Sequence, residues 1–438
     1  MLKDRLYPAY ARFARPKKHQ NRRTTDRGRM VQTGLSISAA LGVDTNLNLI
    51  YQLFALLLCL LIVSKLALRL HPPNVSISRH LPRFATDGQA FDYTLKVTNL
   101  GQRVETDLQV VDTLVIKAPS RDEFQQRVEP GEETRNAYDR AIGFHRFMWL
   151  LRRKTGITLQ ATVVPDLGLT STAQITITAT PLRRGLVHFD ASSLHYPDPF
   201  GLYLGLQHFK HTQQLLVLPR RYSISANLEL PGRSDARAGV SNASLATGDS
   251  DEFVSLRDYR EGDPLRRVHW PSSAKRGKPV IKEFQREHFA RHTLILDSVF
   301  DDATIFEEVI CVAASLLMKM RSSDRAMDLL MLTHQVQHLQ PDHTGTSQLQ
   351  ALAMLHASTL PFAALSDACL RLQNDTSGCV LVLGAWDKAR QSLLESLQAR
   401  QMPVSVFLIC RTADEAIELP AHSYQLPIGQ IQEMLGGM

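Results

Sequence analysis

Apolar residues follow three different patterns along the chain, and each pattern predicts a different architecture. The first is a nearly continuous run: residues 45–64 carry no charged side chain and contain the segment LFALLLCLLIV. A bilayer core of about 30 Å needs about twenty apolar residues in a helix, so this run predicts a membrane-spanning helix. A shorter uncharged segment precedes it, and a polar turn at 42–46 separates the two. Together they predict a transmembrane helical hairpin over residues 30–70.

The number of spans determines on which side of the membrane the rest of the chain lies. Residues 1–29 form a basic tail, which the positive-inside rule keeps in the cytoplasm. Two spans return the following domains to the cytoplasm, whereas one span would place them outside. Lys65 and Arg69, directly after the second apolar segment, favour two spans. We therefore expect a membrane-anchored protein with the bulk of its chain on the cytoplasmic side.

A second pattern begins at Val75, where apolar and polar residues alternate with period two. The segment FDYTLKVTNLG shows this alternation and then stops at a polar turn. Several such strands, separated by Gly, Pro and Asn, predict an antiparallel β-sandwich of immunoglobulin-like size over residues 71–225. Residues 135–155 interrupt it with apolar side chains at helical spacing and several cations. This excursion predicts a helix that lies either on the membrane surface or on the sandwich.

The third pattern, over residues 292–438, is an alternation of buried strands and amphipathic helices. The strands are RHTLILDS, AMDLLMLTH, GCVLVLGAW and VSVFLIC, and helical runs separate them. This order predicts an α/β doubly wound, largely parallel sheet. Such sheets bind ligands at the carboxyl ends of their strands, where we expect Asp297, Thr333 and Asp387.

The order of these elements resembles a von Willebrand factor A-type domain. Domains of that type usually bind a divalent cation through Asp-x-Ser-x-Ser after the first strand. Here the sequence is Asp297-Ser298-Val299-Phe300-Asp301, so both serines of the motif are replaced. We therefore expect no metal site, with Asp297 capping the first helix or lining the edge of the sheet. Ligation of a hard cation by Asp297 and Asp301 is the open alternative.

The distribution of charge argues against a general nucleic-acid role. The chain carries 50 Lys/Arg against 43 Asp/Glu, but residues 1–30 alone hold ten of the cations and two of the acids. The remainder is therefore close to neutral and lacks the basic surface that nucleic-acid binding requires. The five cysteines stand far apart and show no metal-ligand spacing. They predict reduced core thiols, and we expect no cofactor.

Residues 252–284 form the densest polar stretch and the strongest candidate for chemistry. A Ser-x-x-Lys motif begins at Ser272, and His269 with Asp263 and Ser273 could be assembled into a triad. Both hypotheses fail on context. A proline precedes the motif, no nucleophile elbow is present, and triad members are rarely close neighbours in sequence.

A structured joint between domains, over residues 226–291, is the better interpretation of this stretch. Opposite charges alternate in LRDYREGDPLRR, so they can neutralise one another. The same residues could instead form an anion site, because guanidinium forks suit bidentate contacts. The candidate docking or anion surface consists of Arg257, Tyr259, Asp263, Arg266, His269, Trp270, Ser273 and Lys275.

This stretch also resembles the signature of the bacterial domain-of-unknown-function family fifty-eight, which reads Leu-Arg-x-Tyr-x-x-Gly-Asp-x-x-Arg-x-Ile-x-Trp-x-x-Ser-Ala-Lys/Arg-x-Gly. The matching residues are Leu256, Arg257, Tyr259, Gly262, Asp263, Arg266, Val268, Trp270, Ser273, Ala274, Lys275 and Gly277. Val268 in place of isoleucine is the one departure. Segments 181–185, 198–202 and 215–219 also resemble the family.

The resemblance implies two N-terminal spans, a β domain and a von Willebrand A-like C-terminal domain. Members are typically encoded beside MoxR-type AAA+ ATPases, which implies an ATPase partner, and no catalytic residues can be carried over. We therefore expect a membrane-anchored, non-enzymatic adaptor or scaffold that serves complex assembly or cell-envelope function. Its expected partners are that ATPase, the lipid bilayer and other membrane proteins, without nucleic acid.

Two other classes of function remain as alternatives. The first is an anion-binding or hydrolytic enzyme that acts on envelope intermediates through the central Arg/His/Lys motif. The second is a periplasmic adhesion-type module, which requires a single span.

Overall fold

A computed structural model describes most of the chain. The described residues are 2–14, 22–41, 48–115, 118–129, 131–159, 161–225, 228, 230, 252–260, 265, 268–285, 292–300, 302–322, 327–342, 345–372, 376–413, 417 and 419–437. The chain divides into two compact units, Met1–Arg220 with Leu349–Met354, and Arg221–Gln348 with Leu355–Met438. It mixes helices with several sheets, as the three sequence patterns predict.

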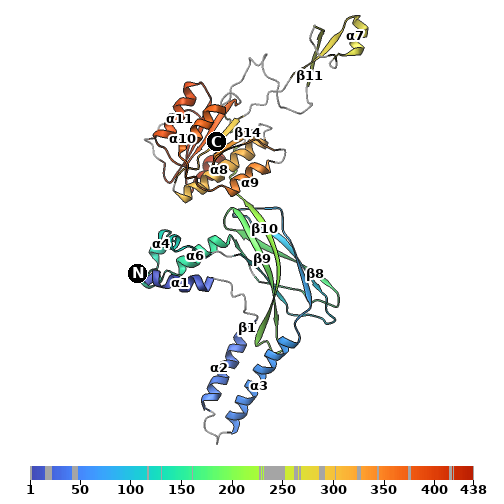
Figure 1. The fold of residues 1–438 in the computed structure, drawn as a ribbon, viewed down its shortest axis with the longest axis vertical. Coiled ribbons are helices and arrows are strands. Elements are labelled where there is room, and N and C mark those ends of the chain that lie inside the picture. The colour runs from blue at the N-terminus through green and yellow to red at the C-terminus, as the bar shows by residue number, and fades with distance from the viewer. Residues whose placement is uncertain are drawn as a thin grey trace. The chain divides into compact units, whose positions relative to one another are not determined.

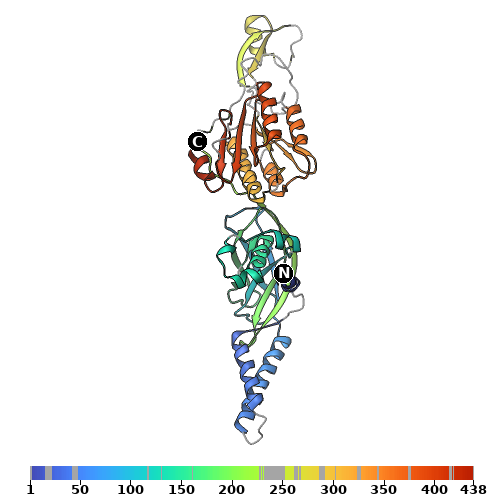
Figure 2. The same cartoon turned by 90° about the vertical axis from the view of Figure 1, so that its left-hand side faces the viewer.

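The first unit begins with helices that flank a short strand. These elements are α1 (Leu2–Ala14), β1 (Arg22–Thr24), α2 (Asp26–Leu41) and α3 (Asn48–Leu70). α2 and α3 lie side by side in both views (Figures 1 and 2). Among the described residues, one helix is long and apolar enough to cross a membrane, over Leu49–Leu70 with a mean hydropathy of 2.4. This helix agrees with the predicted membrane anchor.

Two layers form the β domain of the first unit, and their strands pair antiparallel except for β3 with β10, which pair parallel. One sheet has the order β1-β10-β9-β5-β7 with β3 beside β10, and the other has the order β2-β4-β8-β6. The strands are β2 (Val75–His80), β3 (Phe84–Thr86), β4 (Phe91–Asn99), β5 (Gln109–Leu114), β6 (Ile157–Thr158), β7 (Thr162–Val163), β8 (Thr172–Pro181), β9 (Gly185–Pro197) and β10 (Tyr203–Leu218). Leu95 and Val97 of β4 meet Val110, Phe189 and Leu215 of the other sheet in one buried core. The alternation in the sequence thus predicts the faces of these strands correctly.

The helical excursion is present and is longer than predicted. It comprises α4 (Arg121–Gln126), a 3₁₀ turn (Glu132–Thr134), α5 (Ala137–Ile142) and α6 (Phe144–Thr155). Phe124 and Phe147 are buried together, and Tyr7 and Tyr10 of α1 pack against them. The Tyr7 hydroxyl donates a 2.7 Å hydrogen bond to the carbonyl oxygen of Pro119. Residues 1–29 are expected from the sequence to form a basic tail, whereas α1 within them is a packed part of this helical cluster.

The second unit contains a small hairpin and a larger sheet. The hairpin is β11 (Glu252–Asp258), α7 (Trp270–Arg276) and β12 (Val280–Gln285). The larger sheet has the order β15-β14-β13-β16-β17-β18, and its neighbouring strands are parallel except for β14 with β15. The strands of this sheet and the helices along the same stretch of chain are β13 (His292–Leu296), α8 (Ala303–Ser322), β14 (Met327–Leu332), β15 (Val336–Leu339), α9 (Thr346–Met354), α10 (Phe362–Leu372), β16 (Gly378–Leu383), α11 (Lys388–Ala399), β17 (Val404–Cys410), β18 (Tyr424–Pro427) and α12 (Ile431–Gly437). Most of α9, Leu349–Met354, belongs to the first unit.

Strand order in this larger sheet creates a switch point between β13 and β16, where successive crossovers leave in opposite directions. Doubly wound sheets place their ligand crevice at such a point, outside the carboxyl ends of the strands. Ile295, Leu330, Leu381 and Val406 are buried in one cluster with side chains from α10 and α11. The largely parallel sheet expected from the sequence is therefore present, and its functional edge can be located.

Candidate functional site

Most of the predicted docking residues lie on the hairpin formed by β11, α7 and β12, which we call the signature arm (residues 252–260, 265 and 268–285). β11 and β12 pair antiparallel from Glu252↔Gln285 to Asp258↔Val280. Val268, Val280 and Ile281 are its buried apolar residues among those described. Two-stranded hairpins with so small a core are marginally stable by themselves. The arm therefore depends on local hydrogen bonds or on a partner for its stability.

Ser273 fastens α7 to β12. Its hydroxyl donates a 3.0 Å hydrogen bond to the His269 carbonyl oxygen and accepts a 2.9 Å hydrogen bond from the Val280 amide. The His269 amide in turn donates to the Val280 carbonyl oxygen at 2.8 Å. The Ser273 hydroxyl proton is thus directed at a main-chain carbonyl and not at a base. This arrangement gives Ser273 a structural role and does not support the triad hypothesis.

A second local contact joins His269 to Ser272: the Nδ1 atom of His269 lies 2.7 Å from the Oγ atom of Ser272. This is hydrogen-bonding distance for a nucleophile and its base. Asp263, the acid of the hypothetical triad, and Arg266 lie outside the described residues. Within the described residues, this contact therefore supplies a serine hydroxyl and a histidine base, without the acid that a catalytic triad also requires.

The solvent-facing side of the signature arm combines a large aromatic ring with cations. Trp270 is 68% exposed and Leu265 is 66% exposed. Lys275, Arg276 and Lys278 are exposed on the same helix or directly after it. Arg257 and Tyr259, also predicted for this surface, are half-buried at the end of β11, and the Tyr259 amide donates to the Pro279 carbonyl oxygen at 2.9 Å. The arm thus brings six of the eight predicted surface residues onto one small element.

A buried guanidinium occupies the switch point of the parallel sheet. Arg390 Nε donates to Asp297 Oδ2 at 2.7 Å, and Nη2 donates to the Val299 carbonyl oxygen at 2.7 Å. Arg390 Nη1 pairs with Asp387, which also caps the N-terminus of α11. The guanidinium lies over the Phe362 ring, 4.6 Å from its centroid. Asp297 and Asp387 therefore meet at the edge of the sheet where they are expected. Arg390, which is not among the predicted site residues, joins them.

Pairing with Asp297 and Asp387 allows the guanidinium of Arg390 to remain charged although it is buried. Asp297 is fully buried, and burial raises the pKa of its carboxyl, although Arg390 and the main-chain amides of Val299 and Gly384 oppose the shift. Burial acts to lower the pKa of Arg390, but its contacts with Asp297 and Asp387 outweigh burial and raise it. The guanidinium therefore stays charged. A hard cation could reach Asp297 only by displacing Arg390, and Asp301 lies outside the described residues.

Thr333, the third residue expected at this edge, is part of a turn beside the ion pair. Its main-chain carbonyl accepts a 2.7 Å hydrogen bond from the Ser358 hydroxyl, and the Ser358 amide donates to the Ser298 carbonyl oxygen at 2.8 Å. Ser358 thus connects the residues that follow β13 and β14. These contacts make the edge a closed polar network.

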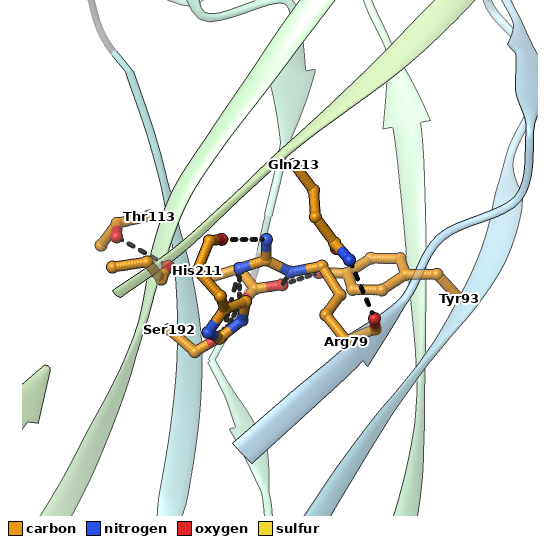
Figure 3. Close-up of polar contacts among 8 residues, drawn as sticks. Arg79, Tyr93, Thr113, Ser192, His211 and Gln213 are labelled. Carbon is orange, nitrogen blue, oxygen red and sulfur yellow. Dashed lines mark hydrogen bonds and ion pairs between the residues drawn. The ribbon is translucent and has the colours of Figure 1, made fainter. Parts of the chain in front are cut away.

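A second buried ion pair, absent from the sequence analysis, lies between the sheets of the β domain. Arg79 of β2 and Asp112 of β5 have fully buried side chains and form two parallel hydrogen bonds of 2.9 Å. The Tyr93 hydroxyl donates to Asp112 Oδ2 at 2.8 Å. Figure 3 shows Arg79, Tyr93, Ser192 and His211 converging on this point.

Ser192 completes the hydrogen bonding of this pair. Its hydroxyl donates to Asp112, accepts from Arg79 Nη2 at 3.2 Å, and lies 3.1 Å from His211 Nε2. Since the hydroxyl proton is used by Asp112, His211 Nε2 must be the donor. The serine thus lies between acid and histidine, whereas in a catalytic triad the histidine lies in the middle. The set is a structural network within the β domain.

His211 reaches this network because the pairing of β10 with β9 is irregular between Lys210 and Gln213. Such an irregularity re-aims side chains that regular alternation would place elsewhere. Burial lowers the pKa of His211, and the charge of Arg79 lowers it further, against the opposing effect of Asp112. His211 is therefore neutral in the folded protein near pH 7.

Replacing Arg390 by alanine is expected to destabilise the second unit strongly, because it leaves the Asp297 carboxylate buried without its counter-charge. We expect a loss of about 3–5 kcal/mol in the free energy of unfolding. Arg390→Lys should fall between wild type and alanine, since it keeps the charge and loses the fork. Denaturant titration of the purified chain measures this, with exposed Arg371→Ala as the control. Equal stability of the Arg390→Ala and Arg371→Ala variants would contradict the structural role.

Acid is expected to destabilise the β domain through His211. Its pKa is lowered by folding, so below about pH 6.5 the unfolded state binds a proton that the folded state excludes, and stability falls as pH falls. One such group contributes a slope of at most about 1.4 kcal/mol per pH unit. His211→Gln should make the pH dependence of unfolding between pH 7 and 5 shallower, and exposed His80→Gln should not. An unchanged slope in His211→Gln would argue against this assignment.

One family model matches both the signature arm and most of the parallel-sheet region. Residues 255–417 match the family model "Protein of unknown function DUF58". The "Uncharacterized protein YeaD" of Bacillus subtilis (strain 168) is 31% identical over 137 residues, which span 31% of this chain and 33% of that protein. The aligned part is therefore about a third of the length of this relative.

Similarities to solved structures are too weak to bear on function. The CARDB domain of the PF1109 protein from Pyrococcus furiosus is 14% identical, covering 33% of this chain and 93% of that one, with a TM-score of 0.20. A cohesin module from a Clostridium perfringens family 33 glycoside hydrolase is 8% identical, covering 33% of this chain and 97% of that one, with a TM-score of 0.18. The sequence match is the informative comparison: residues 255–417 match the DUF58 family model, and this match supports the family resemblance of the signature stretch.

Proposed function

We propose that this chain is a membrane-anchored, non-enzymatic adaptor that presents its signature arm to a MoxR-type AAA+ ATPase. The observation that carries the proposal is the exposed Trp270 beside Lys275, Arg276 and Lys278. Tryptophan is the residue type most enriched among interface hot spots, and a large ring this exposed gains most when a partner covers it. The surrounding cations suit an acidic surface on that partner.

The chemistry of the described polar groups supports a binding role over catalysis. The Ser273 hydroxyl is used between α7 and β12, and the Arg390 guanidinium is used between Asp297 and Asp387. Each group is fixed by partners within the protein and is not directed at a substrate. These arrangements suit a rigid scaffold, which needs no cofactor.

The path of the chain supports two membrane crossings. β1, before α2, pairs with β10, and α1 packs on α6; both partners come after α3. The chain therefore returns to the side from which it entered, which requires an even number of crossings. Residues 30–41 of α2 rise only about 18 Å, so the bilayer must thin locally or charged side chains flanking α2 must snorkel to the headgroups. With the basic N-terminal residues in the cytoplasm, both units lie there too.

The von Willebrand A-like assignment is supported by the strand order β15-β14-β13-β16-β17-β18 with its one antiparallel edge. In this proposal the Arg390 guanidinium takes the place of the divalent cation at the switch point. Two facing, largely antiparallel sheets likewise support an immunoglobulin-like β domain. Binding of the ATPase or of other membrane proteins by this adaptor is then independent of a metal.

The competing proposal is an anion-binding or hydrolytic enzyme that acts on cell-envelope intermediates, and one observation favours it. The Nδ1 atom of His269 lies 2.7 Å from the Ser272 hydroxyl, with Lys275 one turn further along α7. An anionic substrate could then be held by the exposed cations of the arm. This proposal requires Ser272 for function and does not require Trp270 as a docking residue.

Trp270→Ala is expected to reduce capture of the MoxR-type ATPase, because hot-spot truncations cost about 2 kcal/mol or more, roughly thirtyfold in affinity. Lys275→Ala should reduce capture less and make it less sensitive to salt. Co-purification from solubilised membranes measures both, with exposed Lys388→Ala as the control. Full capture by Trp270→Ala would refute the docking surface. Loss of function in Ser272→Ala with capture intact would favour the enzyme.

The side of the membrane can be tested with one introduced cysteine in a background of Cys59→Ser and Cys410→Ser, in which the remaining native cysteines are buried. Ala9→Cys on α1 and Gln89→Cys in the β domain should behave alike, since both lie on the cytoplasmic side. We expect no labelling of either by a membrane-impermeant maleimide in intact spheroplasts, and labelling of both after lysis. Opposite behaviour of the two positions would establish a single span and exclude this topology.

A further inference from the structure

We propose that the end of the β domain next to the α2–α3 hairpin is a docking face for an anionic phospholipid bilayer. This inference rests on the proposed membrane insertion of the hairpin and adds a second contact with the lipid. Two features form the face: exposed cations around the base of the hairpin, and exposed apolar residues at the tips of neighbouring loops. We call the first the basic collar, which consists of Arg23, Arg27, Arg29, Lys65 and Arg69.

The start of α2 is fixed tightly against the turn at residues 198–201. The Thr25 hydroxyl donates a 2.7 Å hydrogen bond to the Gly201 carbonyl oxygen, and the Thr25 amide donates to the Leu202 carbonyl oxygen at 3.0 Å. A Cβ atom at Gly28 would lie only 2.0 Å from the Leu202 carbonyl oxygen, so only glycine allows this approach. The cations at the start of α2 are therefore held at the surface of the β domain.

The end of α3 meets the same surface. Tyr203 is buried there with Leu61 and Leu68, and the Lys65 ammonium lies 5.5 Å from the centroid of its ring. Gln32 of α2 donates a 3.1 Å hydrogen bond to the Tyr203 hydroxyl. Both ends of the hairpin thus converge on one tyrosine, and their cations surround the point where the chain leaves the apolar segment.

Charge in the collar is strongly unbalanced. Asp26 is the one acid within residues 22–29 and 65–71, and it pairs with Arg29. Asp198, in the adjacent turn, is buried and accepts hydrogen bonds from the Phe200 and Tyr203 amides. Cations at the border of an apolar segment attract anionic headgroups, and each contributes separately near the surface. The collar therefore suits the phosphates of anionic lipids.

Apolar loop tips stand at this same end of the β domain. Exposed fractions are 57% for Leu100, 59% for Val104, 60% for Leu169 and 46% for Phe200. Turns and loops normally carry polar residues, so four large exposed apolar side chains at one end call for an apolar cover. Insertion into the boundary between headgroups and acyl chains would bury them.

Hydrogen bonds show that these loops adjoin the hairpin. The Leu100 amide donates at 2.8 Å to the carbonyl oxygen of Asn74, in the short connection between α3 and β2. The Asn99 amide donates at 2.9 Å to the Ser171 carbonyl oxygen, which brings the turn of Leu169 alongside. Exposed Asp107 and Asp166 also lie on these loops, so the attraction for anionic lipid must come from the collar.

Contact of the loops with lipid can be measured in the full chain, inserted into nanodiscs of phosphatidylcholine alone or mixed with phosphatidylglycerol. A polarity-sensitive fluorophore at Leu169→Cys, in a background of Cys59→Ser and Cys410→Ser, should be quenched by lipids with brominated acyl chains. The control is Gln89→Cys, beyond the other end of β4 and about 27 Å away along the strand. Equal quenching at the two positions would overturn the docking face.

The role of the collar is tested by the lipid that remains bound after extraction into detergent. Wild type should retain phosphatidylglycerol over phosphatidylcholine by at least about tenfold. Arg27→Gln, Arg29→Gln, Lys65→Gln and Arg69→Gln combined should abolish this preference. A control with equal loss of charge combines Arg121→Gln, Arg140→Gln, Arg371→Gln and Lys388→Gln, and it should retain the preference.

Two failures are distinguishable in this experiment. Wild-type protein that enters nanodiscs without preferring phosphatidylglycerol overturns the lipid-binding collar and leaves the anchor intact. Wild-type protein that enters nanodiscs of neither composition overturns the membrane anchor, and the collar with it.

Discussion

Three paired positions between β1 and β10 tie the residues before the apolar hairpin to the domain that follows it. The proposed topology depends on this pairing, because it closes a loop of chain that contains both α2 and α3. A hairpin closed in this way can enter a bilayer only as a unit. The packing of Tyr7 and Tyr10 on α6 reinforces the constraint over a separate set of contacts. The N-terminal residues and the β domain must therefore lie on the same side of the membrane in this topology.

Each of the two units contains a buried arginine–aspartate pair, and the two pairs have the same design. Arg79 and Arg390 each donate from two or more nitrogen atoms, and each lies over an aromatic ring, Phe189 or Phe362. Such pairs add little net stability, because the removal of both charges from water offsets their attraction. Their directional bonds fix how neighbouring strands approach one another. In the parallel sheet the pair also lies at the edge where doubly wound sheets bind their ligands.

Periodicity in the sequence predicted the strands, the helices and the parallel sheet, because each depends on which face of a local segment is buried. One signal for the β-domain pair was also present: Arg79 and Asp112 lie in phase with the core positions of their strands. Arg390 gave no such signal, since an arginine three residues after a helix-capping aspartate is ordinary on a helix surface. The packing of α1 could not be predicted either, because Tyr7 meets Pro119 across 112 residues. Long-range partners of this kind are specified by the fold and not by local pattern.

Helix α1 can complete its packing only after a long further stretch of chain has been synthesised. The Tyr10 hydroxyl donates its hydrogen bond to the carbonyl oxygen of Ile142, 132 residues further along. At about 5–20 residues per second, α1 waits roughly 7–26 s for its partner. The α2–α3 hairpin emerges within that interval, so in the proposed topology α1 remains unassembled while the hairpin enters the membrane. In that topology, packing of α1 on α6 closes the β domain onto an anchor already inserted.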